Sequence, residues 1–369
     1  MQSVGRNRIL EIVLFVIAAL IAGITGLITV GVLFWLSDIQ AGRDEEGKHG
    51  ISDRLPSRLG GAAVLVSSLV VLASREFTNP SFTGPIWQHV SVAEIGALAI
   101  GFVGLTEDLL QSLGSIKRLL LLFLISGLCV ALDPDLVPVD MVTWLAPDLM
   151  NQFWIMAPLT VVFVVAFVNA GNIADGANGL LPLILAPLFF VIYSLTGSSF
   201  AFAILLSVTV FASFNLLTGR VILGDAGSYL LSALACLWSL EIYGRQPVSA
   251  WFIAALLAYP CVELMISFVR RVWKRSSPMR ADNHHLHNHL YAWWLGRGLP
   301  ELGANSLTGV TIAFFTTGVA LVFYFGGLSV DSSKWVWVFA SEFALLLVTV
   351  WVLSFRNNSI DTKGLSGNG

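Results

Sequence analysis

The chain has 369 residues, of which 56% are hydrophobic and 12% are charged, and its mean hydropathy is +0.81. This composition excludes an ordinary soluble domain and indicates one integrated helical membrane domain, because apolar runs of spanning length recur along the sequence. The net charge of −3 and the pI near 6.1 give no basic surface suited to nucleic acid. Cys129, Cys236 and Cys261 all lie inside apolar runs, so neither a disulfide nor a zinc pattern is expected.

The apolar runs predict an all-α, polytopic integral membrane protein with about eleven transmembrane helices. The first run continues to about residue 36 without a signal-cleavage pattern, so we expect a retained helix. Residues 1–355 then form a single multi-span domain, and residues 356–369 form a polar tail that we expect to be flexible. The predicted spans are, in order, 9–36, 59–74, 90–105, one ending near 132, 153–168, 180–196, one ending near 217, one ending near 243, 249–269, 307–328 and 335–355.

The distribution of positive charge predicts how these spans are oriented. If they alternate, 15 of the 20 Lys and Arg residues fall on one side of the membrane. Positive charge marks the cytoplasmic face, so we expect a periplasmic N-terminus and a cytoplasmic C-terminus. The segments that combine acids or amides with glycine, histidine or lysine all fall on this cytoplasmic side. The sequence therefore predicts an active site on cytoplasmic loops and helix ends.

One stretch, Asn169-Ala-Gly-Asn172-Ile-Ala-Asp175-Gly-Ala-Asn178-Gly179, separates two apolar runs. Its four amide or carboxylate side chains recur at every third position, so on a helix or tight helical turn they follow one slowly rotating stripe. The glycines allow the backbone to approach a ligand closely. A polar stripe is costly against hydrocarbon, so it should face protein, water or a ligand.

The predicted cytoplasmic segments supply the groups that phosphoryl transfer requires. Mg²⁺ is typically held by one or two carboxylates, with water and substrate phosphates completing its shell. Candidate carboxylates are Glu107, Asp108, Asp175 and Asp225. Candidate phosphate-binding groups are Lys48, Lys117, Arg118 and the histidines at 284, 285, 287 and 289. Acids, a divalent metal and basic groups together suit transfer of a phosphoryl group.

Five motifs occur in order between about residues 48 and 290. They are Lys48-His49-Gly50 through Pro56-Ser-Arg58-Leu-Gly60-Gly61, Glu107-Asp108 followed by Lys117, Asn169-x-x-Asn172-x-x-Asp175-Gly-x-Asn178-Gly-Leu, Gly224-Asp225-x-Gly-Ser, and Asp282-x-x-His285-Leu-His287. In this order they resemble the polyprenyl-phosphate N-acetylhexosamine-1-phosphate transferases. That superfamily includes the undecaprenyl-phosphate GlcNAc-1-phosphate transferase and the phospho-N-acetylmuramoyl-pentapeptide transferase.

The resemblance implies transfer of a sugar-1-phosphate from a UDP-N-acetylhexosamine to undecaprenyl phosphate, with release of UMP. It implies that Asp225 binds Mg²⁺, for which Mn²⁺ could substitute, and that Asp108 activates the lipid phosphate and is a second metal ligand. Glu107, Asp175 and His285 are then further catalytic candidates. The implied substrate-binding residues are Lys48, Lys117, Asn169, Asn172, Asn178, Asn215 and His287.

Two positions depart from the family pattern. Glu107 stands where the first of two aspartates is usual, and its additional methylene keeps the charge but moves it, so its role is open. Asn178 replaces a common aspartate, which argues against a catalytic carboxylate there. The His285-Leu-His287 form, without a triple histidine, favours an O-antigen-like polysaccharide over peptidoglycan, whose pentapeptide transferase is the alternative. The implied location is a bacterial inner membrane; the sugar and the oligomeric state, including a homodimer, stay open.

Simpler interpretations exist for single motifs. Thr106-Glu107-Asp108 also fits a helix N-cap with acids in the first turn, and Gly224–Ser228 fits an ordinary turn. The histidines fit zinc poorly, because no cysteine is nearby.

A secondary transporter would place its charges near the midplane on interrupted helices, whereas a scaffold would not need ordered polar motifs on one side. A CDP-alcohol phosphatidyltransferase also uses aspartates and magnesium, but its Asp-Gly-x-x-Ala-Arg pattern is absent after Asp175.

Overall fold

The computed structural model describes residues 31, 35, 56–78, 90–111, 113–139, 152–273 and 284–365. This part of the chain is helical and contains no β-strand; residues Ser57 and Val221 form an isolated parallel bridge. The expected span 9–36, Lys48 and most of the first loop lie outside the described residues. The helices are α2 (Gly60–Thr78), α3 (Val92–Leu110), α4 (Ser115–Leu132), the short 3-10 helix η2 (Pro134–Leu136), α6 (Phe153–Ala174), α7 (Leu180–Thr196), α8 (Ser199–Thr218), α9 (Gly224–Arg245), α10 (Ala250–Leu256), α11 (Ala258–Trp273), α12 (Leu286–Leu295), α13 (Glu301–Phe315), α14 (Thr317–Phe325) and α15 (Trp335–Leu365).

Each predicted span from 59–74 onward coincides with one helix or with a bent pair of helices. The expected span 249–269 is broken at Leu257 into α10 and α11, which meet at a bend of 81°. The expected span 307–328 is broken at Thr316 into α13 and α14, with a bend of 43°. The hydroxyl of Thr317 donates to the carbonyl of Leu256 at 2.9 Å, so the two breaks are joined to each other.

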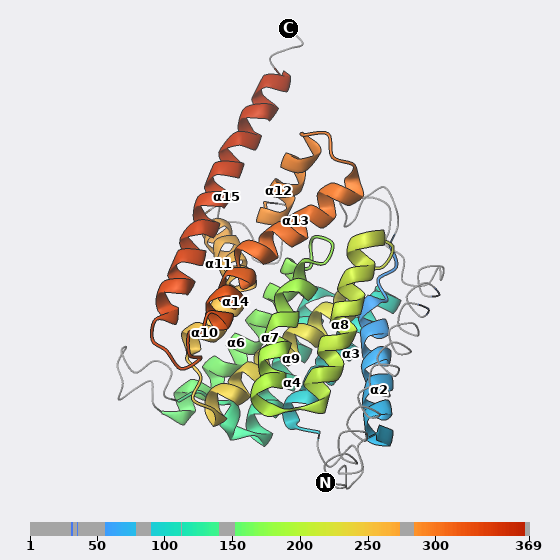
Figure 1. The fold of residues 1–369 in the computed structure, drawn as a ribbon, viewed down its shortest axis with the longest axis vertical. Coiled ribbons are helices and arrows are strands. Elements are labelled where there is room, and N and C mark those ends of the chain that lie inside the picture. Colours follow the sequence, from blue (N-terminus) through green and yellow to red (C-terminus); the bar gives the residue numbers. More distant parts are fainter. Residues whose placement is uncertain are drawn as a thin grey trace, which may run out of the picture.

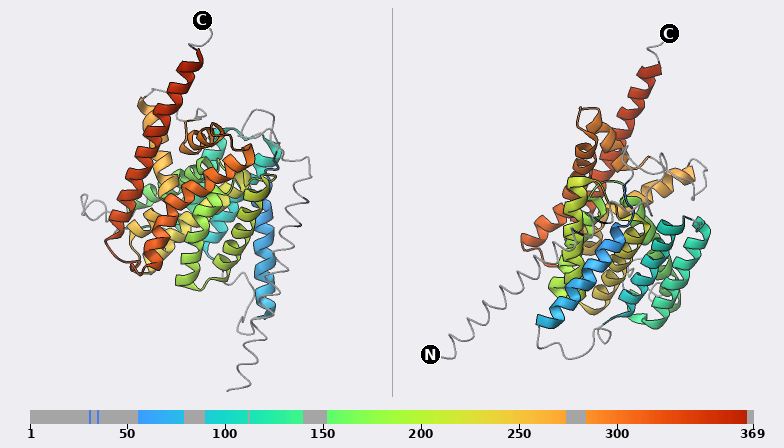
Figure 2. Two further views of the ribbon diagram at one scale, coloured as in Figure 1. Left: turned by 45° about the horizontal axis from the view of Figure 1, so that its top comes forward. Right: turned by 90° about the vertical axis from the view of Figure 1, so that its right-hand side faces the viewer.

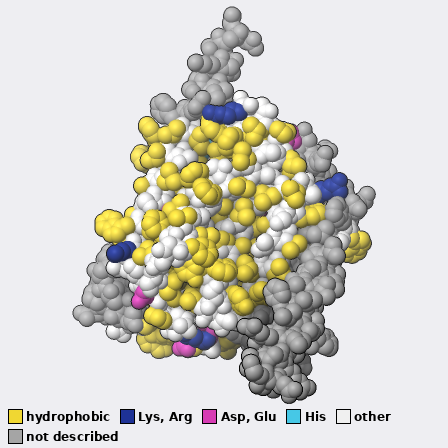
Figure 3. Space-filling view, viewed as in Figure 1, with side chains coloured by type: hydrophobic (Ala, Val, Ile, Leu, Met, Phe, Trp, Pro, Cys, Tyr) yellow, Lys and Arg dark blue, Asp and Glu magenta, His cyan; other side chains and the backbone are white. Residues whose placement is uncertain are grey.

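The outer surface of the bundle is apolar. In the described part of the chain, five helices are long and apolar enough to cross a membrane, or up to seven if each bent pair is one span. Figure 3 shows hydrophobic side chains across the middle of one face, with charged side chains at its margins. These observations support the membrane character of the protein, while the count of eleven spans and their orientation stay predictions.

Helix α9 forms the centre of the bundle, and 89% of its most apolar 18-residue stretch is buried. It packs against α2, α3, α6 and α7. Figures 1 and 2 show α15 on the outside of the bundle, with its C-terminal end extending beyond it. At the end of α6 and α7 that faces α12 and α13 in Figure 1, the loop between α6 and α7 lies beside α13. This end of the bundle carries the polar groups described next.

Candidate active site

Asp108 connects the end of α3 to the beginning of α9. It is fully buried, and its carboxylate accepts hydrogen bonds from the backbone N–H groups of Asp225 at 3.1 Å and Ala226 at 2.7 Å. The first N–H groups of a helix have no partner inside the helix, and the helix dipole favours a negative acceptor there. Asp108 therefore fixes the first turn of α9, and with it the position of Asp225.

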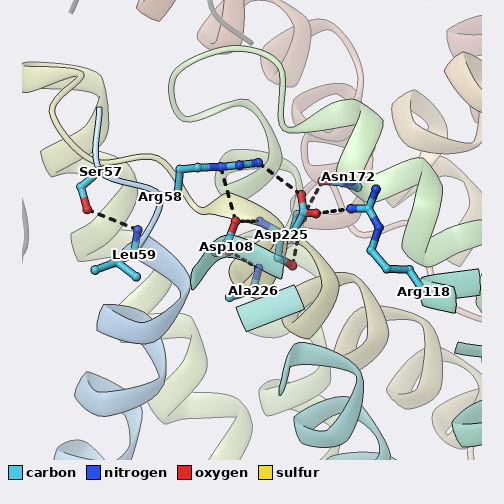
Figure 4. A network of polar contacts seen from close by, with 9 residues as sticks. Ser57, Arg58, Leu59, Asp108, Arg118, Asn172, Asp225 and Ala226 are labelled. Atoms are coloured by element: carbon cyan, nitrogen blue, oxygen red, sulfur yellow. Dashed lines mark hydrogen bonds and ion pairs between the residues drawn. The ribbon is translucent and has the colours of Figure 1, made fainter. Parts of the chain in front are cut away.

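Two arginines approach Asp225 from opposite sides (Figure 4). Nη1 of Arg118 lies 2.5 Å from Oδ2 of Asp225, and Nη2 of Arg58 lies 3.8 Å from Oδ1. Arg58 also reaches Asp108, with Nε 3.4 Å from Oδ1. Charge-assisted contacts of this kind are strong where water is largely excluded. The two cations offset the negative charge that Asp108 and Asp225 bring to this end of α9.

Arg58 is held in place by backbone pairing with the segment before α9. The N–H of Ser57 donates to the carbonyl of Arg220 at 3.0 Å, and the N–H of Ile222 donates to the carbonyl of Ser57 at 2.9 Å. Gly224 lets the two segments come this close. Its φ is +69°, and a Cβ there would lie 2.2 Å from the carbonyl oxygen of Arg58 and 2.6 Å from Oδ2 of Asp108. Any other residue would disturb both contacts.

The polar stretch at residues 169–179 begins inside a helix. α6 continues beyond the expected boundary at 168 to Ala174, and within it Nδ2 of Asn169 donates back to the carbonyl of Val165 at 2.7 Å. One turn later, Oδ1 of Asn172 accepts from the hydroxyl of Ser228 in α9 at 2.9 Å. The stretch thus begins by fastening α6 to the same turn of α9 that carries Asp225.

Asp175 follows α6 as its C-cap residue. Burial raises the pKa of its carboxyl group well above the usual value, and the negative charges of Asp225 and Asp108 raise it further, while Arg58 lowers it. Neighbouring negative charges favour either protonation of one carboxyl group or a cation that offsets the charge.

Asn178 and Asn215 make hydrogen bonds within the protein. Oδ1 of Asn215 accepts from the N–H of Gly179 at 2.5 Å, and Nδ2 of Asn215 donates to the carbonyl of Val221 at 2.7 Å. The N–H of Asn178 donates to Oδ1 of Asn305 at 2.8 Å. In the structure these amides hold the α6–α7 loop against α8, α13 and the segment before α9. Their role in binding substrate stays a proposal.

The histidine segment contacts α11 and the α6–α7 loop. Nδ1 of His285 lies 2.9 Å from Oε1 of Glu263, and Nδ1 of His287 lies 2.9 Å from the hydroxyl of Tyr259. A Cβ at Gly176 would lie 2.0 Å from Nε2 of His287, so this ring packs directly on the loop next to Asp175. Burial, together with the neighbouring His285 and His289, lowers the pKa of His287 to about 3. His287 is therefore neutral at physiological pH.

Glu107 and Lys117, two residues that the sequence predicted for the site, do not contact Asp225. Oε2 of Glu107 accepts from the N–H of Leu113 at 2.9 Å and so closes the turn between α3 and α4. Lys117 is exposed, and the adjacent Arg118 is the cation that contacts Asp225. Lys48 lies outside the described residues.

Sequence reasoning missed the roles of Arg58, Tyr259 and Glu263, and it treated Arg118 only as a general cation. Glu263 carried a usable signal, because an ionisable residue inside an apolar span is expensive and usually has a partner. The pairing of Arg58 and Arg118 with Asp225 had no comparable signal. It depends on contacts between segments far apart in the sequence.

Comparison with known proteins places this site in a family context. Residues 90–243 match the sequence model of glycosyl transferase family 4. The probable undecaprenyl-phosphate N-acetylglucosaminyl 1-phosphate transferase of Bacillus subtilis (strain 168) is 24% identical over 272 residues, which are 70% of this chain and 72% of the relative. The undecaprenyl-phosphate alpha-N-acetylglucosaminyl 1-phosphate transferase of Thermotoga maritima is 30% identical over 165 residues, 45% of this chain and 52% of the relative. The phospho-N-acetylmuramoyl-pentapeptide-transferase of Caldicellulosiruptor bescii is 26% identical over 300 residues, 76% of this chain and 89% of the relative.

The matched region runs from the start of α3 almost to the end of α9. It therefore contains Asp108, Arg118 and Asp225, which meet at the first turn of α9, and Asp175 at the end of α6. The family match and the named relatives agree with the sequence motifs. Over this region the chain is similar to glycosyl transferase family 4, and the named relatives support the superfamily of polyprenyl-phosphate N-acetylhexosamine-1-phosphate transferases that the motifs resemble.

Proposed function

We propose that the protein is a phosphoglycosyl transferase of a bacterial inner membrane. It transfers an N-acetylhexosamine-1-phosphate from a UDP-sugar to undecaprenyl phosphate and so begins a lipid-linked envelope polysaccharide. The observation that carries this proposal is the gathering of Asp108 and Asp225 with Arg58 and Arg118 at one end of an apolar bundle. Phosphates are bound by such cations, and an acceptor lipid reaches such a helix end from the bilayer.

The reaction needs little covalent chemistry from the protein. A phosphate oxygen of undecaprenyl phosphate attacks the phosphorus that bears the sugar. The bond from that phosphorus to the bridging oxygen breaks, and UMP leaves with this oxygen. Arg58 and Arg118 offer donors to the phosphate oxygens, and positioning with charge stabilisation supplies most of the rate in such transfers. Asp108 keeps the first turn of α9 in place throughout.

The carboxylates present fit a magnesium ion. Asp175 and Asp225 repel each other, and a divalent cation at Asp225 would offset that repulsion. The described residues contain no group of three or more His, Cys, Asp or Glu arranged to hold a metal. Asp225 and a neighbouring carboxylate would therefore bind the ion together with substrate phosphates and water, as Mg²⁺ prefers. When bound, the ion would neutralise charge on the phosphates.

The named relatives use two kinds of sugar donor. The relatives from Bacillus subtilis and Thermotoga maritima are named for N-acetylglucosaminyl 1-phosphate transfer, and the Caldicellulosiruptor bescii relative is named for phospho-N-acetylmuramoyl-pentapeptide transfer. The two-histidine form of the last motif supports a simple N-acetylhexosamine donor. A UDP-N-acetylmuramoyl-pentapeptide donor is the alternative outcome of the test.

The test uses the purified full-length protein with undecaprenyl phosphate, Mg²⁺ and a panel of UDP-sugars. We expect UMP and a lipid diphosphate sugar as products with one UDP-N-acetylhexosamine. Omission of Mg²⁺ with added EDTA, and the variant Asp225→Asn, are the controls that should lose both products. Release of UDP would instead indicate ordinary glycosyl transfer. No nucleotide product from any donor would contradict the proposal and favour transport or scaffolding.

A further inference from the structure

Helix α11 presents two polar side chains, four residues apart, to the histidine segment. Tyr259 and Glu263 lie on one face of this helix because residues at this spacing are neighbours. Glu263 is only 2% exposed, and both of its oxygens are used: Oε1 meets Nδ1 of His285 at 2.9 Å, and Oε2 accepts from the N–H of Leu286 at 3.3 Å. A buried carboxylate with two partners from one segment holds that segment in a single orientation.

The two imidazole rings are stacked, and each places its Nδ1 against a side chain of α11. The ring centroids of His285 and His287 are 5.4 Å apart, and the ring planes differ by 15°. Because Nδ1 of each ring faces α11, Nε2 of each ring faces away from it. Nε2 of His287 is covered by Gly176, next to Asp175. Nε2 of His285 has no hydrogen bond among the residues that the structure describes.

We propose that Glu263 is a positioning residue for His285 in the phosphosugar transfer proposed above, on which this inference rests. A carboxylate oxygen accepts hydrogen bonds, so it keeps a hydrogen on Nδ1 and leaves Nε2 on the side of the ring that faces away from α11. Glu263 thereby fixes which nitrogen of His285 is presented to the UDP-sugar, as a buried carboxylate does for a catalytic histidine. His287 has the matching bond to Tyr259, but its Nε2 is covered, so its role is structural.

The activity test compares Glu263→Gln in two backgrounds. Glutamine keeps the shape, but its single oxygen cannot accept from both His285 and Leu286. We expect Glu263→Gln to lower kcat/KM for the UDP-sugar by about 10- to 100-fold, as for other groups that orient a functional histidine. In a His285→Ala background, Glu263→Gln should lower kcat/KM by less than about 2-fold, because the imidazole through which Glu263 acts is gone. Glu263→Asp, which keeps the charge, should recover part of the activity.

Two comparisons separate positioning from mere support of the fold. Tyr259→Phe removes the matching bond to His287, and we expect less than about a 3-fold loss because Nε2 of that ring is covered. Thermal unfolding of every variant is measured alongside. The proposal would be overturned if Glu263→Gln lowered kcat/KM equally in both backgrounds. It would also be overturned if Tyr259→Phe lowered kcat/KM as much as Glu263→Gln does.

A readout without turnover keeps this inference separate from the proposed function. In the full-length protein labelled with [15N]histidine, His285 is assigned by comparison with His285→Asn. We expect its hydrogen on Nδ1 in the wild type, and a shift of the hydrogen to Nε2 in Glu263→Gln. If no UDP-sugar yields UMP but this spectrum is found, the proposed function fails while the contact stands. A wild-type hydrogen on Nε2 overturns the positioning role whatever the activity.

Discussion

Asp108 and Asp225 are joined through the backbone: the carboxylate of Asp108 accepts the N–H of Asp225 at 3.1 Å. The residue that would activate the lipid also holds the helix turn that carries the proposed metal ligand. We therefore predict that Asp108→Asn both stops turnover and lowers stability, by about 1–3 kcal/mol, because the new amide group faces a buried N–H donor. Thermal or denaturant unfolding beside UMP release checks this.

Glu107→Gln is the matched control for Asp108→Asn. Its amide oxygen can still accept from the N–H of Leu113, so stability should stay within about 0.5 kcal/mol of the wild type. If Asp108→Asn unfolds like Glu107→Gln, the hydrogen bonds of Asp108 to α9 do not stabilise the protein as the structure indicates.

Arg118 and Lys117 are adjacent but face different surroundings. Arg118 contacts Asp225 at 2.5 Å, whereas Lys117 is exposed. We predict that Arg118→Gln lowers kcat/KM by about 100-fold, because it removes a cation aimed at the phosphate region. Lys117→Gln should keep activity within about 3-fold of the wild type. A larger loss in Lys117→Gln than in Arg118→Gln would return the phosphate-binding role to Lys117.

Asp175 gives a prediction for pH. Its pKa is raised in the folded protein, so ionisation of Asp175 costs folding stability as the pH rises from the unfolded value, about 3.9, toward the folded value. Asp175→Asn removes this cost. In EDTA, its melting temperature should match the wild type near pH 4 and exceed it increasingly toward pH 8, while turnover is lost. A difference that does not change with pH would contradict the raised pKa.

Gly176 tests the contact between the α6–α7 loop and the histidine segment. A Cβ there would lie 2.0 Å from Nε2 of His287, so Gly176→Ala must displace the loop or the ring. We predict a loss of stability of about 1–3 kcal/mol, typical of overpacking, together with a loss of UMP release. Gly127→Ala in α4 is the control, since a Cβ at Gly127 meets nothing within 4 Å. Equal stability of the two variants would show that this contact is loose.

Glu342 is a buried acid for which the proposed reaction has no use. It is 1% exposed in α15, and in the described part of the chain neither carboxylate oxygen has a hydrogen bond. Glu342→Leu removes these oxygens and should stabilise the protein by about 1–3 kcal/mol. Glu94→Leu is the opposite case, because Glu94 accepts from the N–H of Ser91 at 2.7 Å in a capping box, and it should destabilise. Destabilisation by Glu342→Leu would indicate a partner for this carboxylate.

Helices were predictable where local sequence decides the outcome. Long apolar runs must satisfy their backbone hydrogen bonds internally, so the run 180–196 reappears as α7 with the same boundaries. The break at Leu257 also had a signal, because Pro260 lacks an N–H and is tolerated in the first turn of a new helix. The residues around Thr316 carried no comparable signal for the break there.

The ordered motifs named Asp108, Asp175 and Asp225 as candidates, and in the structure Asp108 and Asp225 are in contact. Their contacts were less predictable than their presence in the motifs. That Asp108 bonds the backbone of α9, and that Arg58 reaches both Asp108 and Asp225, depends on how helices dock over long sequence distances. No local pattern encodes such docking. The partner of Glu263 was not predictable either, because His285 stands at the start of another helix.

The parallel pairing of the segment at Ser57 with the segment at Val221 has a consequence for biogenesis. The ribosome releases Ser57 and Arg58 early, yet the backbone partners of Ser57 at Arg220 and Ile222 emerge only after α2 to α8 have been made. Domains form as their elements become available, so the segment that carries Arg58 lacks these partners while most of the bundle inserts. A nascent chain stopped before Val221 would therefore be inserted without the backbone pairing that holds this segment in place.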